Sequence, residues 1–306
     1  TKIKELVSMS DMIHAIETFF QNGEDEDVIM PERMHIADGD NVGLLMPSIF
    51  GDYYGIKLVG VAPKNADIGE PTLTGTYILH DRQTLKPLAI MDAPTLTSIR
   101  TGAISGVGMK YLAKDDASVV GVIGTGEQGW GHLQAAIAVR PIKTALIYNR
   151  SEARLQAFLK RAQATFPEIT FRVAQPDDIV KQADIMITTT TSQEPVLPKV
   201  DQVDLTGKHV AGAGSFTEEM QEIPDYIIEQ AEHIYVDTFK AFSECGEMQV
   251  AKRFGYTEDN TPTLKEMVKA GEQKDIKEKL TIFKSVGMAI YDSIAAKLIY
   301  EKAMKE

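Results

Sequence analysis

The sequence predicts an α/β protein whose larger part is a doubly wound parallel sheet, and two observations support this fold class. From Ala117 onward, short apolar runs of strand character alternate with stretches of helical periodicity. Parallel strands need long crossover connections, which helices supply, so the alternation is typical of a parallel sheet covered by helices. A glycine-rich loop directly after the first of these strands is the second observation. The expected strands are Val119–Ile123, 145–148, 171–173, 185–189, His209–Gly212 and 234–237, with helices at 128–139 and 151–165.

The glycine loop has the spacing Gly124-x-Gly126-x-x-Gly129 between an apolar strand and a helical stretch. In this arrangement Gly124 permits a tight turn, Gly126 lets a pyrophosphate approach the backbone, and Gly129 lets the helix pack closely on the strand. The free N–H groups at the helix N-terminus favour phosphate binding. The loop therefore predicts a dinucleotide site, with Thr125 and Gln128 among its contacts.

The strand after the glycine loop indicates which dinucleotide is bound. An NAD site usually has a carboxylate at the end of this strand to accept hydrogen bonds from the ribose hydroxyls. Here the strand ends in Asn149, Arg150 and Ser151, and Arg150 is suited to a 2′-phosphate. We therefore expect NADP(H) to be preferred and NAD(H) to be possible. Thr189 and Ser215 follow the fourth and fifth strands, at the edge where such sheets bind ligands.

The N-terminal third predicts a separate α+β module. Ser10 can cap a first helix that ends at Asn22-Gly23. Strands are expected at 42–46, 56–61, 76–80 and 88–91, followed by a helix at 97–112. A last helix at 283–305 carries apolar residues that need a partner surface, so it is expected to pack back on the N-terminal module. The expected domains are 1–114 with 281–306, and 115–280.

Composition excludes several function classes. The 306 residues contain 32 Lys and Arg against 44 Asp and Glu, which gives a net charge of −12 and argues against nucleic-acid binding. The one cysteine, Cys245, allows no intrachain disulfide framework, so we expect a cytoplasmic protein. No run predicts a membrane helix or a signal peptide. The six histidines are all more than 20 residues apart, so no local metal-ligand pair is expected.

Three basic residues stand out in the N-terminal module. Arg33 precedes a strand, Lys57 lies in the middle of one, and Arg100 is on a helix. From the residues alone each remains ambiguous, because a strand lysine can protect a sheet edge and a helix arginine can simply be solvated. The functional alternative is that these residues bind and protonate a substrate.

A series of different short motifs is distributed along nearly the whole chain. They are Pro-Glu-Arg at 31–33, Leu-Met-Pro at 45–47, Gly-Ile-Lys-Leu-Val at 55–59, Pro-Thr at 71–72 with Gly75, Leu-Ala-Ile-Met-Asp at 88–92, the 96–103 segment, the glycine loop at 121–129, and Phe-Lys-Ser-Val-Gly at 283–287. In these motifs the sequence resembles the ornithine cyclodeaminase/μ-crystallin family of dinucleotide-dependent enzymes.

The resemblance implies a fold and a set of residue roles. The fold is a Rossmann domain inserted between an N-terminal substrate and dimerisation module and its returning C-terminal helix, in a homodimer. Arg33 and Arg100 would bind the substrate carboxylate. Lys57 would be the catalytic acid or base, Thr72 would contribute a hydroxyl near the substrate, and Ser285 would belong to the cofactor site. The substrate would be a small α-amino or α-imino acid.

The loop after the fifth strand departs from the cyclodeaminase pattern. Aligning Gly214 and Glu222 with the family places Phe216 where cyclodeaminases have an aspartate, and a phenyl ring neither accepts a proton nor pairs with an ammonium group. Glu218 or Glu219 remains a possible substitute. The departure favours NAD(P)-dependent hydride transfer at the α-carbon of an imino or amino acid, of ketimine reductase or alanine dehydrogenase type. An ornithine cyclodeaminase and a non-catalytic NADP(H)-binding protein of μ-crystallin type are the alternatives.

Overall fold

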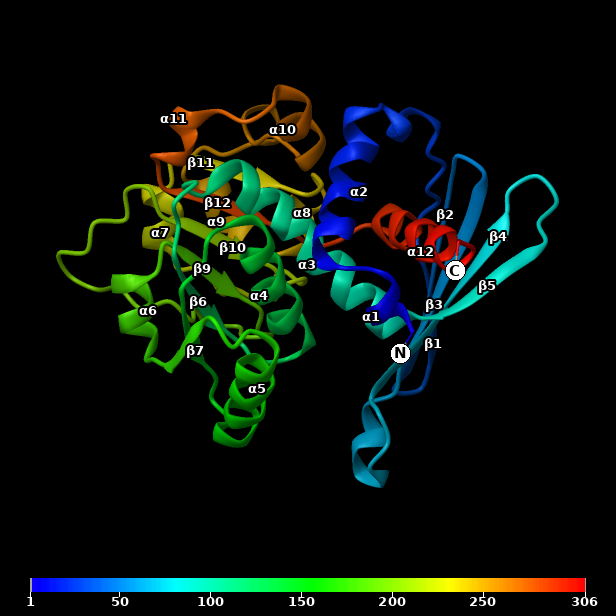
Figure 1. Cartoon of the computed structure of the whole chain (residues 1–306), viewed down its shortest axis with the longest axis horizontal. Helices are drawn as coiled ribbons and strands as arrows, with labels where there is room; N and C mark the ends of the chain where they lie inside the picture. Colours follow the sequence, from blue (N-terminus) through cyan, green and yellow to red (C-terminus); the bar gives the residue numbers. More distant parts are fainter. Residues whose placement is uncertain (1, 306) are drawn as a thin grey trace. The chain divides into compact units, whose positions relative to one another are not determined.

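The computed structural model describes residues 2–305, and the chain divides into two compact units (Figure 1). Unit 1 contains the residues up to Arg100 together with those from Met288 onward, and unit 2 is Thr101–Gly287. The sequence places the junctions at 114/115 and 280/281. In the structure the chain instead passes from unit 1 to unit 2 inside one continuous helix, α3 (Ala93–Leu112), and returns just after Gly287.

Unit 1 is built on a five-stranded antiparallel sheet in the order β1-β2-β3-β4-β5. Its strands are β1 (Met34–Asp38), β2 (Asn41–Phe50), β3 (Tyr53–Val61), β4 (Leu73–Asp81) and β5 (Pro87–Asp92). The sequence predicted the last four, with shorter bounds. Its helices are α1 (Ile3–Leu6), α2 (Met9–Gln21), the start of α3, α12 (Ala289–Ala303) and the 3₁₀ turns η1 (Glu24–Asp27) and η2 (Pro63–Ile68).

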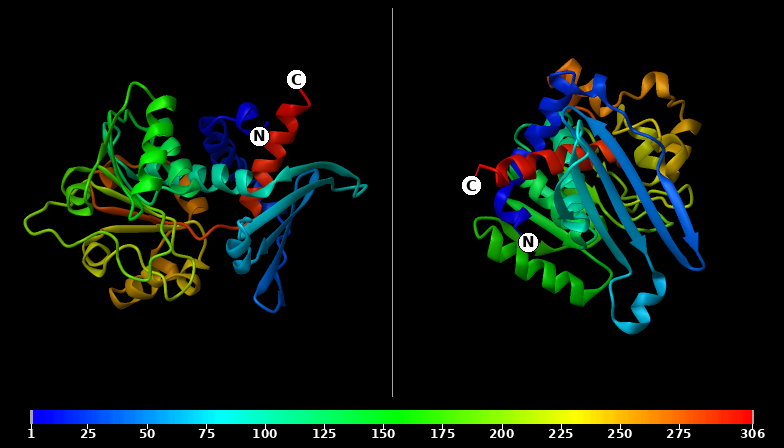
Figure 2. Two further views of the ribbon diagram at one scale, coloured as in Figure 1. Left: turned by 90° about the horizontal axis from the view of Figure 1, so that it is seen from below. Right: turned by 90° about the vertical axis from the view of Figure 1, so that its right-hand side faces the viewer.

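One face of this sheet is covered by helix α12, which crosses β2, β3 and β4 and also contacts α2 (Figure 2). Rings interlock there edge to face: Phe19 lies 5.4 Å from Phe50, and Phe20 lies 6.3 Å from Tyr291, centroid to centroid. Burial of these aromatic rings removes a large apolar area from water, which holds α12 to the sheet. The expectation that the C-terminal helix packs on the N-terminal module is confirmed.

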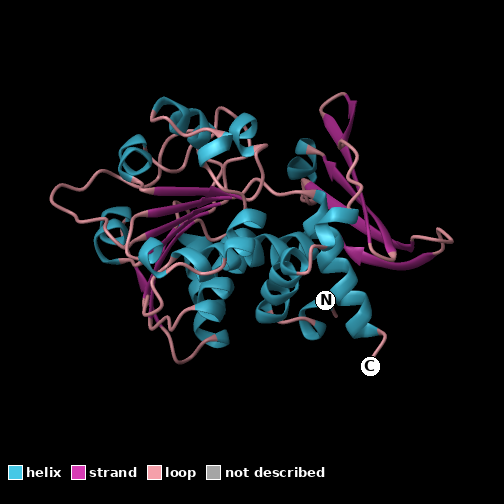
Figure 3. Ribbon diagram, turned by 90° about the horizontal axis from the view of Figure 1, so that it is seen from above, coloured by secondary structure: helices cyan, strands magenta, loops and turns pink. Residues whose placement is uncertain are grey.

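The opposite face of the sheet carries no helix within unit 1 as described (Figure 3). Successive side chains of a strand alternate between faces, so Leu58 lies on the face opposite to Lys57. Leu58 pairs with Leu45 on β2, which in turn pairs with Met34 on β1, so the three side chains lie on the same face. Leu58 is 47% exposed and Met34 is 58% exposed. Ile90, in a neighbouring row of the same face, is 74% exposed. These side chains leave apolar surface exposed on this face of the sheet.

Unit 2 is a seven-stranded parallel sheet in the order β11-β12-β10-β9-β6-β7-β8, with helices on both faces (Figure 3). This confirms the doubly wound class. The strands are β6 (Val119–Ile123), β7 (Thr144–Tyr148), β8 (Thr170–Val173), β9 (Ile185–Thr188), β10 (His209–Gly212), β11 (His233–Val236) and β12 (Thr281–Lys284). The helices are α4 (Glu127–Val139), α5 (Glu152–Thr165), α6 (Pro176–Gln182), α7 (Asp225–Gln230), α8 (Ala241–Glu244), α9 (Gly246–Arg253), η3 (Glu258–Asn260), α10 (Leu264–Ala270) and α11 (Lys274–Lys277).

Two local predictions were wrong. The expected helix at 283–305 begins only at Ala289, because Thr281–Lys284 forms a strand between β10 and β11. Short apolar runs without alternation fit a buried strand as well as a helix, so their periodicity does not separate the two. The first helix is capped by Ser8 rather than Ser10: Ser8 and Asp11 form a reciprocal capping box, which satisfies two backbone N–H groups.

A search of the helices within residues 2–305 finds none with both the length and the apolar character to cross a membrane.

Candidate functional site

The glycine loop of unit 2 joins β6 to α4, and its backbone tolerates only glycine at two of the three motif positions. Gly124 has φ +105°, a conformation that side chains disfavour. A Cβ at Gly129 would overlap the Gly124 carbonyl oxygen, so the close approach of α4 to the loop depends on its absence. A Cβ at Gly126, the N-cap of α4, would meet nothing within 4 Å. Gly126 therefore faces open space in front of a helix N-terminus, as a phosphate site requires.

A cavity of about 460 Å³ opens beside this loop. Several predicted cofactor residues line it, namely Gly124, Thr125, Gly126, Asn149, Arg150 and Thr189. Five others do not: Gln128, Gly129, Ser151, Ser215 and Ser285. The buried Thr125 hydroxyl and the Gln128 side-chain oxygen have no hydrogen-bond partner within the described residues. Buried polar groups are normally satisfied, so these two fit a polar ligand such as a dinucleotide.

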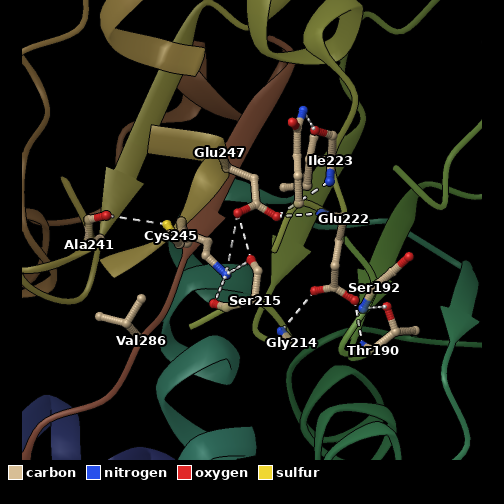
Figure 4. A network of polar contacts seen from close by, with 12 residues as sticks. Thr190, Ser192, Gly214, Ser215, Glu222, Ile223, Ala241, Cys245, Glu247 and Val286 are labelled. Carbon is tan, nitrogen blue, oxygen red and sulfur yellow. Dashed lines mark hydrogen bonds and ion pairs between the residues drawn. The ribbon is translucent and has the colours of Figure 1, made fainter. Parts of the chain in front are cut away.

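Ser215 instead belongs to a buried network after β10 (Figure 4). The Lys284 ammonium group, at the end of β12, donates to the Ser215 hydroxyl at 2.7 Å and to its carbonyl oxygen at 2.8 Å. The Ser215 hydroxyl donates in turn to the Glu247 carboxylate at 2.6 Å. Burial disfavours the charge on Lys284, but the carboxylates around it, Glu247 first, raise its pKa overall. The network thus holds a fully buried cation against its counter-charge.

Glu222 ties the ends of two neighbouring strands together (Figure 4). Its carboxylate accepts hydrogen bonds from the backbone N–H of Thr190, after β9, and of Gly214, after β10, the latter at 2.8 Å. A Cβ on Gly214 would collide with the Thr190 backbone, so glycine is required there. Asp237 similarly holds the segment after β12, accepting from the Ser285 hydroxyl at 2.8 Å and from Gly287 N–H at 2.7 Å. These contacts fix the carboxyl edge of the sheet.

The remaining reactive groups of unit 2 have structural environments. The Cys245 thiol is buried and donates to the Ala241 carbonyl oxygen at 3.3 Å (Figure 4). Burial raises the pKa of Cys245 to about 12, so it stays a thiol, and the thiolate is the nucleophilic form. Within the described residues, no group of three or more His, Cys, Asp or Glu side chains is arranged to hold a metal ion.

In unit 1, three charged side chains from three elements form a buried cluster, which we call the Lys57 cluster. It consists of Lys57 on β3, Arg100 on α3 and Asp292 on α12. The Asp292 carboxylate lies 2.7 Å from the Lys57 ammonium nitrogen through one oxygen and 2.9 Å from Arg100 Nε through the other. The three residues are 4%, 6% and 0% exposed. Asp292 therefore aligns a lysine and an arginine that lie far apart in sequence.

The surroundings of Lys57 lower the pKa of its ammonium group. Burial is the largest cause, and the charges of Arg100 and Arg33 add to it, while Asp292 acts in the opposite direction. Arg33 is exposed and directly precedes β1, and its positive charge contributes to the lowered pKa of Lys57. Thr72 is exposed just before β4, where its carbonyl oxygen accepts from Ala62 N–H at 2.8 Å. Ala62 lies five residues after Lys57, just beyond the end of β3, so Thr72 is not part of the cluster.

The family profile described as "Ornithine cyclodeaminase/mu-crystallin family" matches residues 1–306. The chain belongs to the ornithine cyclodeaminase/mu-crystallin family. The resemblance inferred from the motifs is thereby confirmed.

Among members of this family, a Delta(1)-pyrroline-2-carboxylate reductase of Bacillus cereus is 37% identical over 313 residues, covering 99% of this chain and 95% of that protein. The structure of Thermococcus litoralis Delta(1)-pyrroline-2-carboxylate reductase in complex with NADH and L-proline has a TM-score of 0.86 at 30% identity, covering 99% and 95% of the two chains. An archaeal alanine dehydrogenase dimer with bound NAD also gives 0.86, at 32% identity, covering 99% and 94%. These full-length matches identify the chain as an enzyme of the ornithine cyclodeaminase/mu-crystallin family, an NAD(P)-dependent oxidoreductase of imino or amino acids.

Sequence reasoning missed several residues that shape these two sites. Asp292 is the one charged residue in the first half of α12, 289–296, which is otherwise mainly apolar, and an isolated charge of this kind is a signal that the sequence does offer. Lys284 and Glu247 show no comparable sign, since each lies in a mixed segment. Their roles depend on strand order, which brings β12 beside β10.

Proposed function

We propose that the protein reduces a small α-imino acid with NADPH, with Δ1-pyrroline-2-carboxylate as the substrate to test first. The Lys57 cluster is the observation that carries this proposal. It combines a guanidinium group for a carboxylate with an ammonium group for the imine nitrogen, both oriented by one buried aspartate. The similarity to the pyrroline-2-carboxylate reductases supports this choice of substrate.

In this proposal Arg100 and Arg33 bind the substrate carboxylate. A guanidinium group has five N–H donors, and Asp292 engages Arg100 through Nε alone. The terminal nitrogens of Arg100 are therefore the donors we assign to the carboxylate, in a charge-assisted pair. Arg33 adds a second positive charge. We assign Thr72 a secondary contact at most, because it lies outside the cluster.

Lys57 is the proton donor in this proposal. The imine must carry a proton on nitrogen when its carbon accepts a hydride, so that the π electrons of the C=N bond end on nitrogen as an amine. The protonated Lys57 side chain supplies that proton or holds the nitrogen by a hydrogen bond. In the oxidative direction neutral Lys57 takes the proton back, and its lowered pKa makes this form accessible.

The cofactor role falls to unit 2. Bound in the cavity, the dinucleotide supplies or accepts the hydride at the substrate α-carbon. Gly124, Gly126 and the N-terminus of α4 would bind its pyrophosphate. Thr125 and Thr189 would contribute hydroxyls. Because Arg150 rather than a carboxylate follows β7, we propose NADP(H) over NAD(H).

The exposed apolar face of unit 1 supports a homodimer. Met34, Leu58 and Ile90 lie on this face, each about half exposed or more. A second copy of the same sheet is the partner we propose, since one of the similar solved structures is a dimer. Burial of these side chains at an isologous interface would stabilise the pair.

The test is a panel of turnover assays with the purified protein. NADPH oxidation should proceed with Δ1-pyrroline-2-carboxylate or another cyclic ketimine, and pyruvate with ammonia tests the alanine dehydrogenase type. L-Ornithine with NAD⁺ should yield neither proline nor ammonia. The reason is that the loop after β10 presents the ring of Phe216, 55% exposed, in place of a carboxylate. Efficient cyclisation of ornithine would replace our proposal with a cyclodeaminase, and no turnover with any imino acid would favour a binding protein.

A further inference from the structure

The cavity beside the glycine loop is lined by a second arginine besides the predicted Arg150. Arg154, in the first turn of α5, lines the same cavity as Arg150, which precedes the N-cap Ser151. Both side chains are exposed, and neither guanidinium group has a hydrogen bond or an ion pair within residues 2–305. Two unpaired guanidinium groups thus line the same cavity.

Other charges near α5 do not neutralise these arginines. The Glu152 side chain accepts a hydrogen bond from Gln156 at 2.7 Å and does not line the cavity. Glu194 does line it and is the one carboxylate among the lining residues. A third arginine of the helix, Arg161, is engaged elsewhere: it pairs with Glu127 at 2.8 Å and stacks 3.9 Å from the ring centre of Trp130. Among the described residues that line the cavity, Arg150 and Arg154 are therefore the cations without a partner.

The local backbone orients Arg154. The Ser151 hydroxyl accepts a hydrogen bond from the Arg154 N–H at 3.4 Å, which caps the helix and sets its first turn. The N-terminus of a helix also carries a partial positive charge, which favours an anion beside it. Two like charges held in one place repel each other, and a phosphate group with a charge of about −1.5 to −2 relieves that repulsion where a neutral hydroxyl does not.

We infer that Arg154 acts with Arg150 as a second ligand for the 2′-phosphate of NADP(H), so that the pair, rather than Arg150 alone, determines cofactor choice. The inference rests on the proposed NADP(H) preference. Arg154 then contacts the 2′-phosphate, whereas the glycine loop binds the pyrophosphate, which NADPH and NADH share.

The experiment measures binding, without any imino acid, by calorimetry on the full-length protein. The probes are two pairs, NADPH with NADH and 2′,5′-ADP with 5′-ADP. In each pair only the first member carries the 2′-phosphate. Wild type should bind 2′,5′-ADP more tightly than 5′-ADP. Arg154→Ala should weaken NADPH and 2′,5′-ADP binding about tenfold, the scale of one charge-assisted hydrogen bond, and should leave NADH within twofold.

Two further variants complete the design. Lys160→Ala removes one positive charge from the same helix at an exposed position outside the cavity, and it should bind all four probes as wild type does. Arg150→Ala with Arg154→Ala should abolish the preference for the 2′-phosphate. Equal losses of NADPH and NADH in Arg154→Ala, no loss of either, or a loss matched by Lys160→Ala would overturn the inference. A protein that binds NADPH in this manner but reduces no imino acid would overturn the proposed function and leave this inference standing.

Discussion

Replacement of Asp292 by asparagine tests the Lys57 cluster most directly. The carboxylate pairs with Lys57 through one oxygen and with Arg100 through the other, at 2.7 and 2.9 Å. Asparagine keeps the shape but offers one acceptor oxygen and an amide group that donates. One of the two cations would then face a donor, and both would lose their counter-charge.

The size of the effect follows from the burial of the three groups. The side chains of Lys57, Asp292 and Arg100 are 5%, 1% and 7% exposed, so solvent screening does not reduce the cost. Breaking a buried ion pair by removing one partner costs about 3–5 kcal/mol. Because asparagine retains one oxygen, we expect about 3 kcal/mol, which lowers the melting temperature by roughly 6–12 °C.

The activity should change in a direction that stability alone does not explain. Asp292 raises the pKa of Lys57 against the lowering by burial, so its loss lowers that pKa further. In the reductive direction the protonated form of Lys57 is active, and it is then lost at a lower pH. The alkaline limb of the kcat profile should therefore move to lower pH, while NADPH binding, measured separately, stays unchanged.

The control is Asp225→Asn, which removes an exposed ion pair with Arg253 at 3.1 Å. Exposed pairs contribute about 0–1 kcal/mol, so its melting temperature and pH profile should match wild type. The reasoning is refuted if Asp292→Asn behaves as this control does in both measurements.

Three further predictions concern other parts of the molecule. Lys57→Met should lower the rate of imine reduction at least a hundredfold, which is the scale of general acid catalysis, and should leave the NADPH affinity measured by calorimetry unchanged. A residual rate above a tenth of wild type would exclude Lys57 as proton donor. Gly129→Ala should abolish NADPH binding, because the new methyl group overlaps the Gly124 carbonyl oxygen; normal affinity in titrations would show that α4 can shift. Leu58→Asp with Ile90→Asp should convert a dimer to monomers in sedimentation velocity, and a persisting dimer would place the interface elsewhere.

The fold could be predicted from the sequence where its determinants are local. Helix α4 and strand β6 adjoin a glycine loop whose spacing has a physical reason at each position, and their bounds were predicted to within a residue. The strand Thr281–Lys284 was missed, and its last two residues were assigned to the C-terminal helix, because its pairing with β10 and β11 joins distant segments. Nothing within a four-residue segment, of which only Ile282 and Phe283 are apolar, specifies such partners.

For the candidate sites, the sequence by itself determined the glycine loop, the absence of a carboxylate after β7 and, through the family motifs, the importance of Lys57 and Arg100. Only the tertiary structure decided what orients them. Arg100 and Asp292 are 192 residues apart, and they meet because α12 packs across the sheet that carries Lys57. Glycine requirements follow from the backbone nearby, whereas the pairing of buried charges depends on which elements pack together. That packing is set by the burial of whole apolar faces, and no local motif records it.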